Sequence, residues 1–397
     1  MPSTVKDRIS AEFSRHEPRV IELSHRIAAQ PELAFEEHKT AAAIVELLRA
    51  HGGFVIEEEV AGLDTAFAAT AGHGSLVVGL CAELDALPGI GHGCGHNVIA
   101  AASVGAALAL AEAADDLDVT VRLLGTPGEE RGAGKKIMLR NRAFDGLHTA
   151  MMMHPQLKDM ATPRTRALGH WSVSYHGHTG HASRPFQARN AADAVTIAQV
   201  AIGLLRQQLR PSDRVHTVIK EAGSAVNVIP GHAVVECMVR ADTLKEVDAL
   251  WARVRGCFEA GAVGADVTMQ VSEPLMLLNG FQHDAALAAL FQSNAEALGR
   301  VFPDYPDQSL GSTDMAEVSV QMPAIHPVLS FNCPPEHGNH TAEFAAAAAG
   351  PEGDRAVHDG GLALAWTIAD AAQDKEIRHR LTDAGPFRWA DAAEEDQ

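Results

Sequence analysis

Apolar residues in the first half of the chain follow helical and strand-like patterns in alternation. Helical spacing covers residues 5–29 and 36–51, and short apolar runs between turn residues indicate strands. Strands that alternate with helices usually form parallel sheets, so the pattern predicts an α/β fold whose mostly parallel mixed sheet is sandwiched by helices. The expected strands span residues 65–70, 75–81, 118–125 and 149–153.

A further helix is expected over residues 98–114, between two of these strands. Its apolar residues lie on nearly every side, and a helix without a polar face belongs in the interior of a domain. The segment is slightly short for a membrane span and rich in alanine, so the sequence favours a buried core helix.

From about residue 168 the order of the elements changes. Signals for strand, helix, strand, strand, helix and strand follow, and this βαββαβ order is typical of a ferredoxin-like α+β unit. After residue 274 the signals again suit the opening domain. We therefore predict a main domain of residues 1–167 and 275–397, with residues 168–274 inserted in it. The supporting segments are 171–176, 191–209, 214–222, 233–240, 244–262, 266–271, 284–298, 324–331 and 354–372.

Composition limits the partners and the location. The formal net charge of the 397 residues is −19 and no basic cluster stands out, so neither nucleic acid nor an anionic membrane is an expected partner. Five scattered cysteines suit a reducing compartment, and no apolar signal segment is evident near residue 1. A cytoplasmic location is expected, with residues 390–397 as a solvated acidic tail.

Cys94 and His96 lie one residue apart in a glycine-rich turn after an apolar strand. A thiol and an imidazole so close together are potential soft metal ligands. Taken alone the pair proves little, because cysteine is often a small buried hydrophobe and histidine is often a hydrogen-bonded core residue. The remaining candidates change this interpretation.

The other candidate donors share one property, which is that each follows the carboxyl end of an expected strand. Those ends meet at one edge of a parallel sheet, where such folds assemble ligand sites. Thiolate, imidazole and carboxylate donors suit zinc, manganese or cobalt, and their number exceeds what one tetrahedral ion needs, so two divalent ions are expected. These donors are Glu129, Glu130, His154 and His340.

Adjacent Glu129 and Glu130 suit a division of labour. Neighbouring side chains point in different directions, so one carboxylate can coordinate metal while the other accepts a proton from the attacking water. A Glu-Glu pair is often only a solvated turn. The glycines on either side, at 125, 128, 132 and 134, instead indicate backbone that approaches something closely.

Seven ordered motifs resemble the aminoacylase and carboxypeptidase G family of metallohydrolases. Within that family the chain is most similar to the p-aminobenzoyl-glutamate hydrolase and β-alanyl-lysine dipeptidase branch. The motifs are AELDALPGIGHGCGHN at 82–97, GTPGEE at 125–130, MMMHP at 151–155, GHTGHAS at 177–183, NVIPG at 227–231, GSTDM at 311–315 and HTAEF at 340–344.

The resemblance implies a role for several of these residues. Glu129 would be the general base, and the inserted domain would serve as a lid and a dimerisation domain, making a homodimer. His181 would stabilise the tetrahedral oxyanion, and Asn227 and Arg240 would meet the polar end of the substrate. The implied metal ligands are Cys94, His96, Glu130, His154 and His340.

Two positions depart from the family pattern. Many relatives carry a His-x-Asp ligand pair where this chain has Glu83 and Asp85, so we expect Asp85 to play a supporting role near the metals. Relatives in the auxin-conjugate branch have aspartate where this chain has Asn97. Its side chain could instead cap the helix that follows.

Further polar residues admit both a functional and a structural reading. Arg184 and the nearby Arg189 could bind a substrate carboxylate or be exposed structural residues. Ser312 and Thr313 could hydrogen-bond substrate or cap a turn. The histidines at 176 and 178, close to His181, could form a separate metal cluster, although surface or lid contacts explain them better.

The sequence thus predicts a metal-dependent amidohydrolase that cleaves a small N-acyl amino acid, an aryl amide or an unusual dipeptide. The expected cofactors are two divalent ions, manganese or zinc with cobalt as a third choice, and the expected partner is a small amide substrate. Two alternatives remain, namely a hydrolytic deaminase of an aromatic amine on the same scaffold and a non-catalytic metal-binding protein.

Overall fold

The protein, seen here in a computed structural model, forms two compact units. The structure describes residues 4–305 and 310–390. Unit 1 contains the chain up to Pro163, the stretch that begins at Gln282, and the chain from Glu317 onward. Unit 2 contains Arg164–Phe281 and a later segment that ends at Ala316. The range predicted for the insertion, 168–274, falls within unit 2, and all but the first residue of the predicted acidic tail lies outside the described residues.

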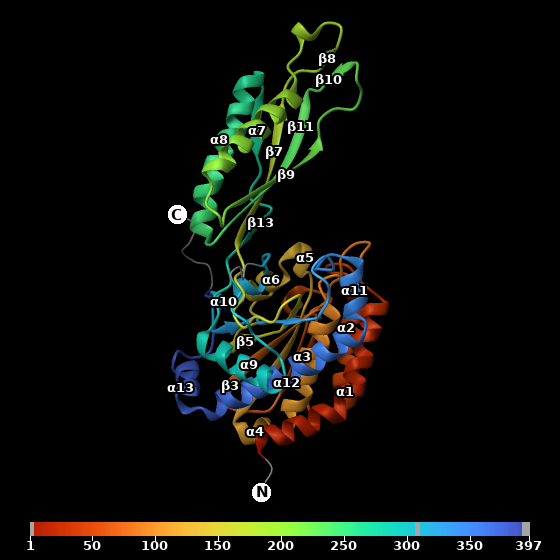
Figure 1. Ribbon diagram of the computed structural model, residues 1–397, viewed down its shortest axis with the longest axis vertical. Coiled ribbons are helices and arrows are strands. Elements are labelled where there is room, and N and C mark those ends of the chain that lie inside the picture. Colours follow the sequence, from red (N-terminus) through yellow and green to blue (C-terminus); the bar gives the residue numbers. More distant parts are fainter. Residues whose placement is uncertain (1–3, 306–309, 391–397) are drawn as a thin grey trace. The chain divides into compact units, whose positions relative to one another are not determined.

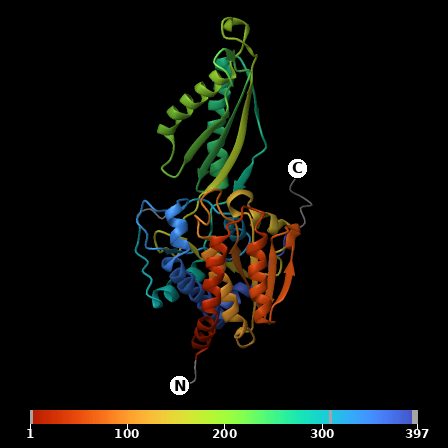
Figure 2. The same cartoon turned by 90° about the vertical axis from the view of Figure 1, so that its right-hand side faces the viewer.

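A six-stranded mixed sheet forms the centre of unit 1, with strand order β1-β2-β4-β3-β5-β14. Strands β4, β3, β5 and β14 run parallel to one another, whereas β2 pairs antiparallel with both β4 and β1 at one edge of the sheet, drawn in orange in Figure 2. The predicted mostly parallel mixed sheet is confirmed. The strands are β1 Val55–Glu58, β2 Phe67–Ala71, β3 Leu76–Glu83, β4 Val119–Thr126, β5 Thr149–Met151 and β14 Ala324–Ile325.

Helices cover this sheet, and α1, α3 and α12 pack against one another beside it (Figure 1). The helices of unit 1 are α1 Val5–Ala29, α2 His38–His51, α3 His96–Ala111, α4 Ala114–Leu117, α5 Glu129–Gly132, α6 Gly134–Arg140, α9 Ala285–Ala297, α11 Ala342–Ala348, α12 Pro351–Gln373 and α13 Lys375–Asp383. The short helix α10 covers Met315–Ser319.

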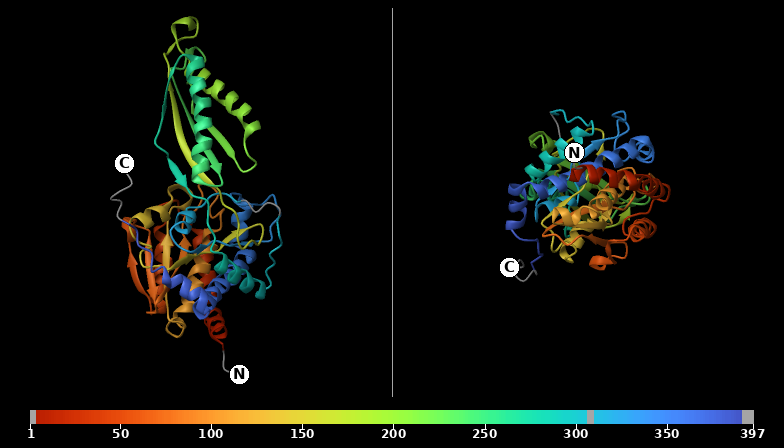
Figure 3. Two further views of the ribbon diagram at one scale, coloured as in Figure 1. Left: turned by 90° about the vertical axis from the view of Figure 1, so that its left-hand side faces the viewer. Right: turned by 90° about the horizontal axis from the view of Figure 1, so that it is seen from below.

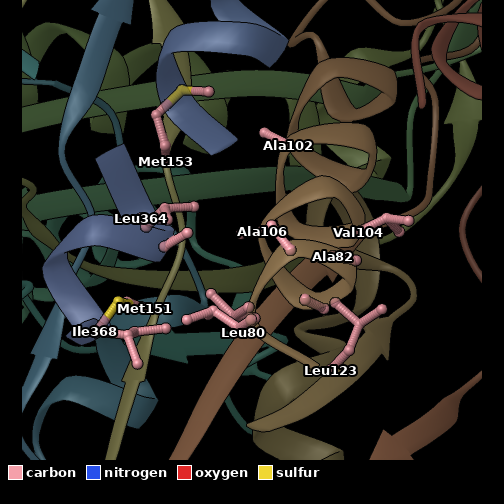
Figure 4. Packing of buried hydrophobic residues seen from close by; sticks show 14 of the residues in the cluster. Leu80, Ala82, Ala102, Val104, Ala106, Leu123, Met151, Met153, Leu364 and Ile368 are labelled. Carbon is pink, nitrogen blue, oxygen red and sulfur yellow. The ribbon is translucent and has the colours of Figure 1, made fainter. Parts of the chain in front are cut away.

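Helix α3 lies in the core, as its apolar pattern predicts. Every residue of α3 up to Leu110 is buried, and Figure 4 shows its small side chains beside residues of β3 and α12. Phe13 of α1 fits against two glycines, because a Cβ on Gly105 or on Gly361 would come within 2.8 or 2.5 Å of its ring. The polar Ser103 is satisfied, since its hydroxyl donates to the carbonyl of Cys81 at 2.7 Å. Close packing of this kind holds the carboxyl edge of the sheet in place.

The single strand predicted over residues 324–331 is wrong, because the structure has two strands there. β14 pairs with β5 in the main sheet, and β15 (Val328–Ser330) pairs with β6 (His154–Gln156) in a separate two-stranded sheet. Pro327 lies at the break, where a residue without a backbone N–H cannot continue the ladder. The predicted strand over 149–153 likewise ends early, so β6 begins at His154.

Unit 2 has an antiparallel sheet of order β12-β7-β11-β9, which is the ferredoxin-like arrangement, and β13 extends it beside β7. Its two helices lie on the same face of this sheet (Figure 3), where Trp171 and Trp251 stack with centroids 4.2 Å apart. A separate pair of short strands is β8 and β10. The elements are β7 Ala167–His176, β8 Gly180–His181, α7 Ala191–Leu205, β9 Arg214–Glu221, β10 Val228–Ile229, β11 His232–Ala241, α8 Leu244–Ala265, β12 Thr268–Val271 and β13 Met276–Leu278.

Across the described residues, none of the helices combines the length and the apolar character that crossing a membrane requires.

Candidate metal centre

Unit 1 brings the sequence-predicted donors together beyond the ends of its strands. Donor atoms within 4.8 Å of one another form three overlapping groups in the described part of this unit. One contains Cys94, Glu130 and His340, the second contains His96 with Glu129 and Glu130, and the third contains His96 and His154 with Glu83. All five predicted ligands and Glu129 therefore belong to one cluster.

Gly95 makes the approach of His96 to His154 possible. Its φ of 76° is left-handed, and a Cβ at this position would lie 2.5 Å from Cγ of Pro155. The chain can therefore turn tightly between Cys94 and the first residue of α3. As a result the rings of His96 and His154 stand perpendicular, with centroids 6.2 Å apart.

His340 reaches the cluster from the loop between β15 and α11. Its φ is +70°, an unusual conformation for a residue with a side chain, and its backbone N–H donates to the carbonyl of Gly93 at 2.9 Å. This hydrogen bond joins the His340 loop to the turn that carries Cys94. Non-glycine residues in this conformation are often found at functional sites, and His340 fits that trend.

Asp85 ties two donor-bearing segments together. Its Oδ1 and Oδ2 accept the backbone N–H groups of Glu129 and Glu130 at 3.1 and 3.0 Å, and its carbonyl accepts Nδ1–H of His96 at 2.7 Å. Burial alone would raise the pKa of Asp85, but hydrogen bonds from His96 and from the Glu130 amide lower it below its usual range. Asp85 thus holds the segments that carry three of the candidate donors.

Sequence reasoning did not single out Glu37, a second carboxylate that holds the loop directly before α5. Glu37 is buried, and it accepts the backbone N–H groups of Gly128 and Phe35 and the hydroxyl of Thr65 at 2.8–2.9 Å. Burial raises its pKa. The residue follows no strand and belongs to no motif, so its position in the sequence carried no signal for this role.

Glu83 was noted only as a departure from the family pattern, and Lys135 was not noted. Both side chains are buried, and Nζ of Lys135 lies 2.6 Å from Oε1 of Glu83. Burial opposes ionisation of Glu83, yet Lys135 and His96 hold its pKa down, to about 2. Glu83 is the last residue of β3, two residues beyond the end predicted for this strand, and nothing in the sequence linked its carboxylate to a lysine on α6.

The chemistry of the cluster fits divalent metal ions. In residues 4–305 and 310–390, Oε2 of Glu83, Nε2 of His96 and Oε1 of Glu130 are buried without a hydrogen-bond partner, although they face one another. Such groups are costly to bury unless a cation compensates them. These atoms, with the thiol of Cys94 and the rings of His154 and His340, could hold the ions.

Electrostatics agree with this assignment. Burial lowers the pKa of His96, but Glu83 and Asp85 reverse this effect and raise it well above the ordinary value, so the site attracts positive charge. Burial and the Glu130 carboxylate raise the pKa of the Cys94 thiol, which a bound cation would counteract. Burial lowers the pKa of His154 and favours its neutral, ligating form.

The remaining predicted site residues lie in unit 2. His181 on β8 is exposed and pairs with Val228 of β10, while the carbonyl of neighbouring Asn227 accepts N–H of Ala182 at 3.0 Å. Arg184 is exposed in the loop after His181. Nearby Arg189 forms an ion pair with Asp266.

Arg240, Ser312 and Thr313 form a second set within unit 2. Burial and the neighbouring Arg166 guanidinium lower the pKa of Arg240, and neither arginine has an ion pair with any described residue. The hydroxyl of Ser312 donates to the Arg166 carbonyl at 2.7 Å, and Thr313 Oγ1 accepts N–H of Met315 at 3.1 Å. Both hydroxyls thus have backbone partners.

The expectation that Asn97 caps a helix is wrong. Helix α3 begins at His96 with Gly95 as its N-cap, and the Asn97 amide donates to the hydroxyl of Ser24 and to the carbonyl of Ala348, both at 2.9 Å. The sequence could not reveal these partners, because they come from α1 and α11.

The separate histidine cluster that the sequence left open does not appear in the structure. The ring of His176 instead contacts that of His232 of β11, tilted by 36° with centroids 4.9 Å apart. Among the described residues, His176, His178 and His181 enter no group of converging donors.

A set of converging thiol, imidazole and carboxylate donors at the carboxyl edge of an α/β sheet is typical of the centre of a metallohydrolase. The chain matches the model of peptidase family M20/M25/M40 over residues 79–359, and it belongs to that family. The resemblance drawn from its motifs is confirmed. The chain is a metal-dependent hydrolase of amide or peptide bonds.

Two relatives show how far the similarity extends. The chain is 32% identical over 385 residues to the Xaa-Arg dipeptidase of Mus musculus, covering 92% of this chain and 88% of that protein. It is 31% identical over 288 residues to one of the subunits of the p-aminobenzoyl-glutamate hydrolase of Escherichia coli (strain K12), covering 67% of this chain and 59% of that subunit.

Solved structures share the fold. A putative aminohydrolase from methicillin-resistant Staphylococcus aureus has a TM-score of 0.74 at 20% identity, over 93% of this chain and 100% of that chain. A dinuclear metal-binding peptidase of family M20 from Bacillus subtilis has a TM-score of 0.67 at 21% identity, over 91% of this chain and 99% of that chain.

We expect Asp85→Asn to weaken metal binding by about 10–100-fold, the usual effect of removing a partner that orients ligands. The substitution turns an NH₂ group toward one of two backbone N–H donors and so loosens the Glu129–Glu130 segment. Calorimetric titration of chelator-treated protein with Zn²⁺ measures the affinity.

Asp159→Asn is the matched control for this change. Asp159 is a buried carboxylate that also accepts two backbone N–H groups, from Ser330 and Val301, and it enters none of the donor groups of the described chain. We expect this variant to lose stability but to keep its affinity. Unchanged affinity in Asp85→Asn would mean that the Asp85 hydrogen bonds do not position the ligands.

Proposed function

We propose that the chain is a dinuclear amidohydrolase that cleaves the amide bond of a small N-acyl amino acid, aryl amide or dipeptide bearing a free carboxylate. The observation that carries the proposal is the convergence of five sulfur, nitrogen and oxygen donors with an additional carboxylate, Glu129. Five donors suit two ions, manganese or zinc with cobalt as a third choice, and leave Glu129 for proton transfer. Such ions would polarise the scissile carbonyl and acidify a water molecule.

Glu129 is the proposed general base. It opens α5 directly before the ligand Glu130, and its backbone is fixed by Asp85, so its carboxylate stays at the edge of the donor cluster. In this role it accepts a proton from the attacking water and passes it to the leaving amine nitrogen, which departs as a neutral amine.

His181 is the proposed oxyanion donor. The backbone N–H of Ser183 donates to Nδ1 of His181 at 3.1 Å, so Nδ1 is an acceptor and the ring proton belongs on Nε2. An exposed Nε2–H is the group that a developing oxyanion needs.

The uncompensated Arg240 and its neighbour Arg166 support a substrate with a carboxylate. Two guanidinium groups close together repel each other, and an anionic group between them would relieve that repulsion. Asn227 and Arg184 are further proposed contacts of the substrate. Xaa-Arg dipeptidase and p-aminobenzoyl-glutamate hydrolase are names for enzymes whose substrates contain an amino-acid unit, which agrees with this class.

We also propose a homodimer formed through unit 2, with unit 2 acting as a lid. Helix α7 presents an apolar stripe to solvent, in which Ile197, Val200 and Leu204 are 36%, 60% and 64% exposed, and Val263 of α8 is 84% exposed. A second copy of this chain would cover such a stripe. We place the protein in the cytoplasm, where the free Cys94 thiol stays reduced.

A substrate panel tests the proposed reaction. The purified chain, loaded with Mn²⁺, Zn²⁺ or Co²⁺, is incubated with N-acyl amino acids, aryl amides and dipeptides, and both the released amine and ammonia are measured. We expect amide cleavage, and at least about tenfold slower cleavage of a dipeptide whose terminal carboxylate is amidated, because one charge-assisted contact is lost. Ammonia with the amide intact would indicate a deaminase, and bound metal without turnover would indicate a metal-binding protein.

We expect Glu129→Gln to retain its metal and to lose about 10²–10⁴-fold in kcat, because the amide cannot accept the proton. Steady-state rates and metal analysis of the same sample measure both effects. Glu343→Gln, which alters an exposed carboxylate close to His340 in sequence, should leave both unchanged. Near-normal turnover in Glu129→Gln would remove Glu129 from the mechanism.

We expect His181→Ala to lower kcat by about 10²–10³-fold, the usual loss when one oxyanion donor is removed, with metal content unchanged. The control is His178→Ala, since His178 is exposed in the same segment and has no proposed role. Should metal be lost together with activity in His181→Ala, His181 would be a ligand instead.

A further inference from the structure

Glu83 and Lys135 form a buried ion pair beside the donor cluster. The relative exposures of the two side chains are 1% and 0%, and Nζ of Lys135 lies 2.6 Å from Oε1 of Glu83. The second oxygen, Oε2, faces the cluster and has no hydrogen-bond partner among residues 4–305 and 310–390. The ion pair with Lys135 therefore accounts for the burial of Oε1 but not for the burial of Oε2.

Oε2 of Glu83 lies opposite Nε2 of His96, which also lacks a hydrogen-bond partner among the described residues. Oε2 of Glu83 lies 3.3 Å from Nε2 of His96, yet neither atom makes a hydrogen bond in the described structure. Nδ1 of His96 donates to the Asp85 carbonyl, so Nε2 is the nitrogen that carries the ligating lone pair. In the neutral ring this nitrogen and the carboxylate oxygen are both acceptors, and a cation between them would relieve their repulsion.

The spacing suits a shared ion. Oxygen and nitrogen donors at about 2.1 Å from a tetrahedral ion are roughly 3.4 Å from each other, close to the observed separation. His154 supplies a further donor, because one ligand atom from each of Glu83, His96 and His154 lies within 4.8 Å of the others.

We infer that Glu83 is a sixth metal donor, which completes one ion site with His96 and His154 while Cys94, Glu130 and His340 form the other. Lys135 is a positioning residue, because its ammonium group binds Oε1 and leaves Oε2 directed at the ion. The inference rests on the proposed dinuclear site and deepens it. The two sites differ chemically, since one contains a thiolate and the other only oxygen and nitrogen donors.

The test measures metal rather than activity. Chelator-treated protein is dialysed against a buffered series of free Zn²⁺ concentrations, and zinc per chain is determined by mass spectrometry. We expect two ions in the unaltered chain. In Glu83→Gln we expect one ion bound as before and the second at least about tenfold more weakly, since even an indirect partner of a ligand has an effect of that size.

Three further variants make the result decisive. The double variant Glu83→Gln with Lys135→Met removes both charges together. It leaves no unpaired buried charge and so keeps the test valid if the single variant does not fold. It should show the same loss of the second ion. Lys135→Met alone should still bind two ions, the second with a smaller loss of affinity than in Glu83→Gln, because Glu83 remains and the ion itself compensates its charge. Asp359→Asn disrupts another buried pair, with Arg300 at 2.6 Å, and should leave both zinc affinities unchanged.

The outcomes separate this inference from the proposed function. Two ions bound with unchanged affinity in Glu83→Gln, or in the double variant, would make the Glu83–Lys135 pair purely structural and overturn the inference alone. A loss in Lys135→Met as large as in Glu83→Gln, or a loss in Asp359→Asn, would also overturn it, because disruption of packing would then explain the effect. Fewer than two ions in the unaltered chain would overturn the dinuclear proposal and this inference together.

Discussion

The three acceptor oxygens of Asp85 are the constraint on which the metal centre depends. The carboxylate holds two consecutive backbone N–H groups, at Glu129 and Glu130, while the carbonyl sets the orientation of the His96 ring. Two strands that are neighbours in the sheet thereby contribute their loops to one centre. Because Asp85 is itself buried and hydrogen-bonded on both carboxylate oxygens, it has little freedom to serve as a ligand, and it holds the candidate donors in position.

Buried negative charge is the second constraint, and the protein balances it locally. Glu83 has Lys135 as its partner, whereas Glu37 is stabilised by hydrogen bonds from two backbone amides and a hydroxyl. The ligands themselves depend on cations for the same balance. Unit 1 therefore carries donors such as Cys94 and His96 that are buried and held by hydrogen bonds around them, while His181 of unit 2, the proposed oxyanion donor, is exposed.

The sequence allowed the donors to be found because each of them follows an apolar strand and several are flanked by glycine. Strand-end convergence then placed Cys94, His154 and His340 in one site without any distance information. The same reasoning missed Glu37 and Lys135, whose importance comes from contacts between segments far apart in the chain. Sequence reasoning also predicted a single strand across Pro327. Only the structure shows that β14 and β15 are separate strands, because they pair with different partners.

The position of α12 near the end of the chain has a consequence for synthesis on the ribosome. Helix α3 packs against both α1 and α12, but α12 is translated only after all of unit 2. At a translation rate of about 5–20 residues per second, the apolar surface of α3 stays without α12 for on the order of ten seconds or more. Unit 2 can complete most of its own core in that interval. The nascent chain thus passes through a state in which unit 2 is complete while the unit that carries the candidate metal ligands still lacks one of its core helices.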